Sequence, residues 1–92
     1  MTEVSIDVQM TPNPNALKFT LDRATTAGGP RTYRSTTEAG DSVAAAGLLE
    51  IKGVVSVFMT GNFISINKTP EAKWDEIVPV AVEAIRAGFT GP

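Results

Sequence analysis

The sequence predicts an α+β fold, a two-layer sandwich in which two helices cover one face of an antiparallel sheet of four or five strands, in the order ββ(β)αββα. Four runs of alternating apolar and polar residues have the period of half-buried strands. Two further segments repeat apolar residues at helical spacing. Short turns join the strands, which favours antiparallel pairing with both helices on one face. With 92 residues and no internal repeat, the chain is expected to form a single domain over residues 1–92.

The first two strands are expected on either side of a proline–asparagine segment. Alternation runs over residues 4–10, and one face of that strand would carry Val4, Ile6, Val8 and Met10. Residues 11–15 contain two prolines, which lack a ladder donor, so the strand ends there and a hairpin connection follows. The next strand presents apolar residues at alternate positions. These are Leu17, Phe19 and Leu21.

An exposed loop is expected over residues 22–31, because they are small and polar and contain Gly28-Gly29-Pro30. The spacing of these glycines matches no phosphate-binding motif. Residues 32–36 are β-prone but few, and they predict a short edge strand.

A second hairpin is expected over residues 54–67, with a tight turn at Thr60-Gly61-Asn62. Alternation assigns two sets of residues to the core face. These are Val55, Val57 and Met59 in one strand and Ile64 and Ile66 in the other. Phe58 and Phe63 have the opposite parity, so they are expected on the other face of the sheet, as an apolar patch unless the loop or residues 32–36 cover it.

The first helix is expected over residues 42–52, capped by Asp41 and ended by Gly53, with Gly47 allowing close packing against the sheet. The second is expected to begin at Thr69-Pro70-Glu71. It repeats large apolar residues, ends at Gly88, and returns Phe89 to the core. Its apolar positions are Trp74, Ile77, Val78, Ala81, Val82 and Ile85. Pro79 removes one backbone bond and predicts a kink or a helix in two pieces.

Composition excludes several classes of function. The chain contains no cysteine and no histidine, which excludes thiolate nucleophiles, Ser–His–Asp triads and metal sites built from those ligands. No acid–base constellation is visible, so we expect no enzyme, and Glu71, Asp75 and Glu76 fit a solvated helix face.

The eight basic residues are scattered and the net charge is −2, which speaks against nucleic acid as a partner. Neither a signal peptide nor an apolar run long enough for a bilayer is visible, so the expected compartment is the cytoplasm, with no membrane association.

Three segments, in order, resemble the N-terminal domain of the Nfu/NifU-type iron–sulfur scaffold proteins. The first is Thr11-Pro12-Asn13-Pro14-Asn15-Ala16-Leu17-Lys18-Phe19. The second combines Gly53-Val54-Val55-Ser56-Val57-Phe58 with Asn62-Phe63-Ile64-Ser65-Ile66-Asn67-Lys68. The third is Trp74 with Ile77, Pro79 and Ile85. Together they cover nearly the whole chain.

The resemblance implies the same fold and a part in iron–sulfur cluster assembly. Scaffolds of this family bind their cluster through a Cys-x-x-Cys motif in a separate C-terminal domain, and this chain has no cysteine. We therefore expect no metal or cofactor on this chain, and an accessory role through contacts with protein partners such as iron–sulfur scaffolds or clients. A small-ligand-binding or regulatory domain that uses the uncovered sheet face is the alternative, and a stability module without a partner is a third.

Two segments are candidates for partner binding. The loop residues are Thr11, Pro12, Asn13, Pro14 and Asn15, followed by Lys18, and the hairpin residues are Thr60, Gly61, Asn62 and Phe63. Proline and asparagine can equally build a rigid turn that sets the hairpin register. A pre-ordered loop also loses little conformational entropy on docking, so the sequence leaves both interpretations open.

Overall fold

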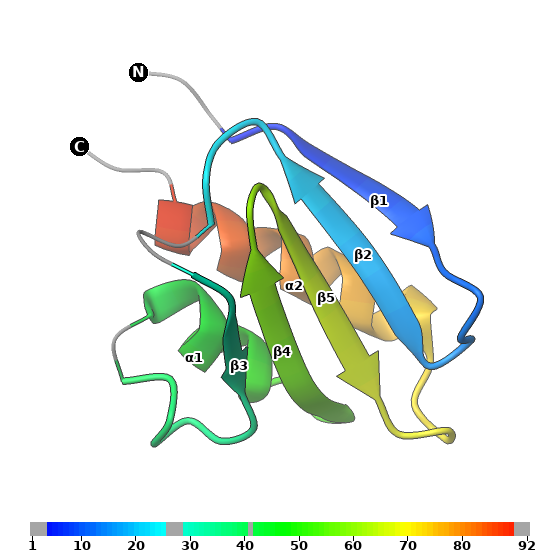
Figure 1. Cartoon of the computed structure of the whole chain (residues 1–92). Helices are drawn as coiled ribbons and strands as arrows, with labels where there is room; N and C mark the ends of the chain where they lie inside the picture. Colours follow the sequence, from blue (N-terminus) through cyan, green and yellow to red (C-terminus); the bar gives the residue numbers. More distant parts are fainter. Residues whose placement is uncertain (1–3, 26–28, 41, 90–92) are drawn as a thin grey trace.

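The computed structural model describes residues 4–25, 29–40 and 42–89, which form one five-stranded sheet and two helices (Figure 1). The elements are β1 (Ile6–Met10), β2 (Ala16–Leu21), β3 (Arg31–Tyr33), α1 (Val43–Leu49), β4 (Val54–Thr60), β5 (Phe63–Lys68) and α2 (Trp74–Phe89). The strand order is β1-β2-β5-β4-β3, and every neighbouring pair is antiparallel. Both helices lie behind the sheet in Figure 1, on the same face. The predicted α+β architecture is confirmed.

The core lies between the sheet and the helices, and alternation predicted most of its strand residues. From the three central strands, the buried side chains are Leu17, Phe19, Leu21, Val57, Met59, Ile64 and Ile66. From the helices they are Ala44, Ala45, Leu48, Ile77, Ala81 and Ile85. Tyr33 of the short edge strand β3 is also buried, although that strand covers Arg31–Tyr33 instead of the expected 32–36.

The prediction for Val55 is wrong. The register between β4 and β5 shifts between Val54 and Ser56, which is a β-bulge, and Val55 is 49% exposed. A bulge adds one residue to a strand and reverses the parity that precedes it. The alternation that places Val57 and Met59 in the core therefore does not extend back to Val55.

The prediction that β1 has a buried apolar face holds for only part of the strand. Val4 is buried and Ile6 is half-buried. Val8 is 40% exposed and Met10 is 88% exposed, because the helices do not cover the far end of this edge strand. An apolar stripe thus continues along β1 beyond the core.

The first helix begins and ends differently from the prediction. Ser42 is its N-cap, and the Ser42 hydroxyl accepts a hydrogen bond from the backbone N–H of Ala45 at 3.2 Å. Asp41, the predicted cap, lies outside the described residues. The helix ends at Leu49, before the predicted residue 52. An added Cβ on Gly47 would lie 3.3 Å from the Ala84 side chain of α2, so this glycine packs against a helix and not against the sheet.

The second helix begins later than predicted. Residues 69–72 form a turn, closed by a bond from the Ala72 N–H to the Thr69 carbonyl at 3.2 Å, and α2 starts only at Trp74. It continues through Pro79 as one helix, so of the two alternatives expected there, a kink or a helix in two pieces, the second is wrong. It also passes Gly88 and includes Phe89, which is half-buried against the core as expected.

Gly53 is the point where α1, β4 and the 69–72 turn converge. Its φ is +99°, and an added Cβ would lie 2.5 Å from the Ala72 Cβ. The Gly53 carbonyl also accepts from the Thr69 N–H at 2.8 Å. Only glycine satisfies both the positive φ and this close approach.

We predict that Gly53→Ala lowers the free energy of unfolding by about 2–4 kcal/mol, because it combines left-handed strain with a steric clash. Gly61→Ala is the matched control: Gly61 has a φ of +54° but no atom within 4 Å of an added Cβ. That variant should lose only about 1 kcal/mol. Urea unfolding followed by circular dichroism measures both, and equal losses would contradict the role of the Ala72 contact.

Candidate docking surface

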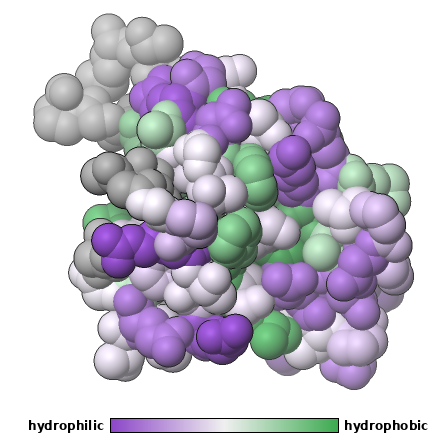
Figure 2. All heavy atoms as spheres, viewed as in Figure 1, coloured by the Kyte–Doolittle hydropathy of each residue, from purple (hydrophilic) through white to green (hydrophobic). Residues whose placement is uncertain are grey.

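The face of the sheet opposite the helices is open, and hydrophobic residues gather at its centre over β4 and β5 (Figure 2). The registers define which residues share this face, since directly opposed residues in antiparallel strands point to the same side. One row across the sheet is Gln9, Lys18, Ser65, Phe58 and Thr32. The next row is Asp7, Thr20, Phe63 and Thr60. We call these residues the open face.

Lys18, Phe58 and Phe63 form a cluster at the centre of the open face. The two phenyl rings have centroids 6.3 Å apart and are tilted by 52°. The Lys18 ammonium lies 4.5 Å from the centroid of the Phe63 ring, within cation–π range. All three side chains are half-buried, so the aromatic pair is partly accessible on this face. Residues 26–28, part of the loop that was expected as a possible cover, lie outside the described residues. The structure thus brings together two of the candidate residues, Lys18 and Phe63.

The hairpin between β4 and β5 is bonded to the last residue of β2 and to the segment that follows it. The carbonyl of Gly61 accepts from the N–H of Thr25 at 2.8 Å and from its hydroxyl at 3.1 Å. The carbonyl of Asn62 accepts from the Leu21 N–H at 2.7 Å. Thr60 and Phe63 are paired across the hairpin, which leaves Gly61 and Asn62 as its exposed tip. The predicted turn is therefore present, with two loop residues instead of three.

One titratable pair adjoins this end of the sheet. The Arg23 guanidinium donates to the Asp22 carboxylate at 2.8 Å and to the Phe89 carbonyl at 3.0 Å. The hydrogen bond from Arg23 holds the pKa of Asp22 below its usual value of 3.8. The ionised Asp22 carboxylate therefore stabilises the folded state above pH 3.8, and this contribution is lost as the pH falls through the lowered pKa. Water screens this ion pair, because both side chains are partly exposed, so the pair adds little to the stability of the domain. Through its bond to the Phe89 carbonyl, Arg23 also links the segment that follows β2 to the last residue of α2.

The loop of residues 11–15 is ordered by its own side chains. The Asn13 amide oxygen accepts from the Asn15 N–H at 2.9 Å, and the Asn13 carbonyl accepts from the Ala16 N–H at 3.0 Å. The Thr11 hydroxyl is directed at the carbonyls of Asn13 and Ala16, at 2.8 and 3.0 Å. These bonds set the register of the β1–β2 hairpin.

Two residues outside the loop attach it to the rest of the domain. The Lys68 ammonium donates to the Asn15 amide oxygen at 3.1 Å, and the indole N–H of Trp74 donates to the Pro14 carbonyl at 2.9 Å. The Lys68 ammonium also lies 5.6 Å from the centroid of the Trp74 ring. Sequence reasoning missed this attachment, because nothing in the spacing of Lys68 and Trp74 indicates a contact with a loop more than 50 residues earlier. Trp74 packs partly buried against the core, as expected of an apolar position of the second helix, and it also joins that helix to this loop.

The two candidate segments lie at opposite ends of the sheet. Ala16, next to the loop, pairs with Asn67, whereas Thr20 pairs with Phe63 beside the hairpin tip. Ala16 and Thr20 are four residue steps apart along extended strand, about 13 Å at roughly 3.3 Å per step. The loop and the hairpin tip therefore do not form one compact site, and the open face lies between them.

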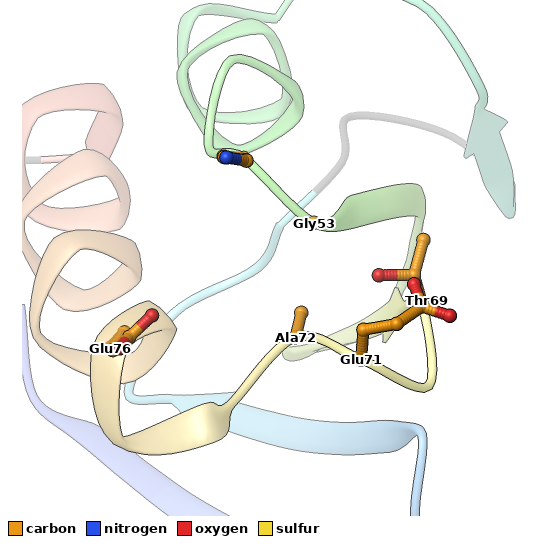
Figure 3. A pocket seen from close by; sticks show the side chains of 6 residues that line it. Gly53, Thr69, Glu71, Ala72 and Glu76 are labelled. Atoms are coloured by element: carbon orange, nitrogen blue, oxygen red, sulfur yellow. The ribbon is translucent and has the colours of Figure 1, made fainter.

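A pocket of about 530 Å³ lies away from the open face, between the end of α1 and the start of α2 (Figure 3). It is lined by Lys52, Gly53, Thr69, Glu71, Ala72 and Glu76. In Figure 3, Ala72 points toward Gly53 and Glu76 projects from the first turn of α2. Among the described residues, no group of three acids, cysteines or histidines converges as a metal site would require. The pocket has charge of both signs and no arrangement of catalytic groups.

Comparison with known proteins gives the family. The profile described as "Scaffold protein Nfu/NifU N terminal" matches residues 6–91. The chain belongs to the Nfu/NifU N-terminal domain family. The resemblance noted in the loop, the second hairpin and α2 is thereby confirmed. Within the described residues, no helix has both the length and the apolar character needed to cross a membrane.

The relatives of this Nfu N-terminal domain differ in name. "Conserved virulence factor C" from Staphylococcus aureus (strain MRSA252) is 32% identical over 84 residues, which covers 91% of this chain and 21% of that protein. "NifU-like protein 5, mitochondrial" from Arabidopsis thaliana is 31% identical over 74 residues, 80% of this chain and 27% of that protein. The solution NMR structure of a NifU-like protein from Saccharomyces cerevisiae superposes with a TM-score of 0.79 at 27% identity, over 92% of this chain and 77% of that one. The chain thus spans about a fifth of the first relative and about a quarter of the second.

We predict that Asn13→Ala lowers the free energy of unfolding by about 0.5–1 kcal/mol, because the Asn15 N–H loses its acceptor. Asn13→Asp keeps an oxygen at the same place and should stay within a few tenths of a kcal/mol of the wild type. Chemical denaturation measures both, and amide hydrogen exchange at residues 13–16 locates the change. Equal stability of the alanine and wild-type proteins would show that the Asn13 side chain does not hold the loop.

Proposed function

We propose that this chain is a non-catalytic accessory module in iron–sulfur cluster assembly that acts by docking to a protein partner through the open face. The Nfu/NifU family is associated with iron–sulfur cluster biology, and the yeast and Arabidopsis relatives carry NifU-like names. The partner would be a scaffold or a client of that system. The observation that carries the mechanism is the cluster of Lys18, Phe58 and Phe63 on a sheet face that no helix covers.

The absence of thiol groups supports a role through contact. Iron–sulfur clusters are held by cysteine thiolates, with histidine replacing some of them in certain centres, and this chain has neither residue. Any part that it takes in cluster chemistry must therefore depend on ligands from another molecule.

The chemistry of the open face suits a protein partner. Aromatic side chains are enriched at the cores of protein interfaces, and a rigid sheet loses little conformational entropy on docking. Phe58 and Phe63 supply the apolar centre, and polar residues such as Gln9, Thr20 and Ser65 surround them. An interface of standard size covers about 800 Å² on each partner, wide enough to extend from this cluster to the hairpin tip. The pocket beside Gly53 lies elsewhere, so it gives no support to a small ligand on this face.

We predict that anaerobic incubation of the isolated chain with iron and sulfide yields no stable visible chromophore, because no soft anionic ligand is available. Absorption spectroscopy after desalting measures this, with a cysteine-bearing Nfu C-terminal domain as the positive control. A stoichiometric cluster on the isolated chain would contradict the proposed division of roles.

We predict that immobilised wild-type chain retains iron–sulfur assembly or client proteins from an extract of its own organism, and that Lys18→Glu and Phe63→Ser each reduce this at least about tenfold. Loss of a hot-spot residue at the centre of an interface costs about 2 kcal/mol or more, and about 1.4 kcal/mol is a factor of ten. Quantitative mass spectrometry measures the retained proteins.

The matched control is Val80→Ser, since Val80 is 52% exposed on α2, on the side of the domain away from the open face. Circular dichroism confirms that each variant is folded. Retention that is equal for all four proteins, or that includes no iron–sulfur protein, would contradict the proposal.

A further inference from the structure

The two edge strands of the sheet differ in how they are protected against pairing with another strand. An edge strand presents unpaired backbone N–H and C=O groups, and proteins protect it by keeping it short or by adding charge, proline or a bulge. β3 has three of these features: it is three residues long, Pro30 precedes it, and Arg31 lies within it. β1 has five residues with regular register, no proline and one charged residue, Asp7. Among the described residues, β1 pairs only with β2.

The helix side of β1 is also unusually apolar for an exposed edge. Ile6, Val8 and Met10 lie opposite the buried Leu21, Phe19 and Leu17, so they share the face that the helices cover. Val8 and Met10 are nevertheless 40% and 88% exposed. Nothing else in the described part of the chain accounts for this exposed apolar stripe.

The side chains of β1 are complementary to a second copy of the same strand. In a two-fold antiparallel pair centred on Val8, Val8 faces Val8, and Asp7 of each copy faces Gln9 of the other. The carboxylate then meets an amide that can donate to it, instead of a like charge. Ile6 of each copy faces Met10 of the other, which covers the most exposed large hydrophobic side chain of the described surface. A pair centred on Asp7 would instead bring the two carboxylates together.

We propose that two copies of this chain associate through β1 in this antiparallel register and form one continuous ten-stranded sheet. The partner strand is β1 of a second copy, because in this register apolar residues face apolar residues and each Asp7 carboxylate faces a Gln9 amide. Such a strand pair is smaller than the roughly 1,200–2,000 Å² of a stable complex, so the dimer should form at high micromolar to millimolar concentration. The open faces of both copies stay accessible and lie on the same side of the joined sheet.

The test is sedimentation equilibrium of the full chain from about 10 μM to about 1 mM, together with ¹⁵N-resolved NMR spectra over the same range. The wild type should show a monomer–dimer equilibrium, with concentration-dependent amide shifts concentrated in residues 6–10. Val8→Lys places two ammonium groups at the two-fold axis and should weaken association at least about tenfold. Val80→Lys is the matched control: it introduces the same charge at a valine that is 52% exposed on α2, and it should dimerise as the wild type does.

Two further variants test the register. Gln9→Glu places like charges opposite each other twice and should weaken association several-fold. Adding Asp7→Lys to Gln9→Glu converts both contacts into opposite-charge pairs and should restore it to at least the wild-type level. A wild type that is monomeric throughout, association that Val8→Lys does not weaken, or a double variant no tighter than Gln9→Glu would each overturn the proposal.

Discussion

Close packing of the two helices against each other is the constraint on which the rest of this domain depends. An added Cβ on Gly88 would lie 2.6 Å from the Ala44 Cβ, and one on Gly47 would lie 3.3 Å from the Ala84 Cβ. Small residues at these positions let α1 and α2 lie side by side on one face of the sheet. Their buried side chains and one face of the strands then form most of the core, and within the described residues no helix covers the opposite face.

A sheet covered on one side only has a second face available for function. In this domain that face is neither uniformly polar nor hidden, since Phe58 and Phe63 lie at its centre with Lys18 above one ring. The chain carries no thiolate, so the chemistry typical of an iron–sulfur scaffold requires ligands from elsewhere. An apolar open face and the lack of thiolates are both consistent with a domain that acts by docking.

The loop of residues 11–15 lies at the other end of the sheet, where Lys68 and Trp74 attach it to β5 and α2.

The sequence was a good guide wherever one local rule decided the structure. Period-two alternation placed Phe19 and Ile64 in the core and Phe63 on the opposite face, and Gly61 marked the hairpin turn. It failed where tertiary contacts override a local rule. The bulge reversed the face of Val55, which alternation cannot foresee.

The second helix shows the same limit. A threonine–proline–glutamate start at residue 69 is a strong local signal, but the contact between Ala72 and Gly53 is made by a turn, and the helix begins only at Trp74. For the candidate site, the sequence indicated Lys18 and Phe63 separately but not that they lie together. The pairing of Lys18 with Phe63 depends on which strands are neighbours, since β2 pairs with β5 and not with β4. Strand order of this kind is set by the whole fold and cannot be read from either segment alone.

The central claim is that the open face, and not the helical side, meets an iron–sulfur partner. The most direct measurement is an NMR cross-saturation experiment on deuterated, ¹⁵N-labelled chain, with an unlabelled iron–sulfur scaffold protein from the same organism. The account predicts that saturation transfers to amides around Lys18, Phe58 and Phe63 and leaves α1 and α2 unaffected. Transfer confined to the helices, or none at a concentration of partner that saturates a positive control, would contradict it.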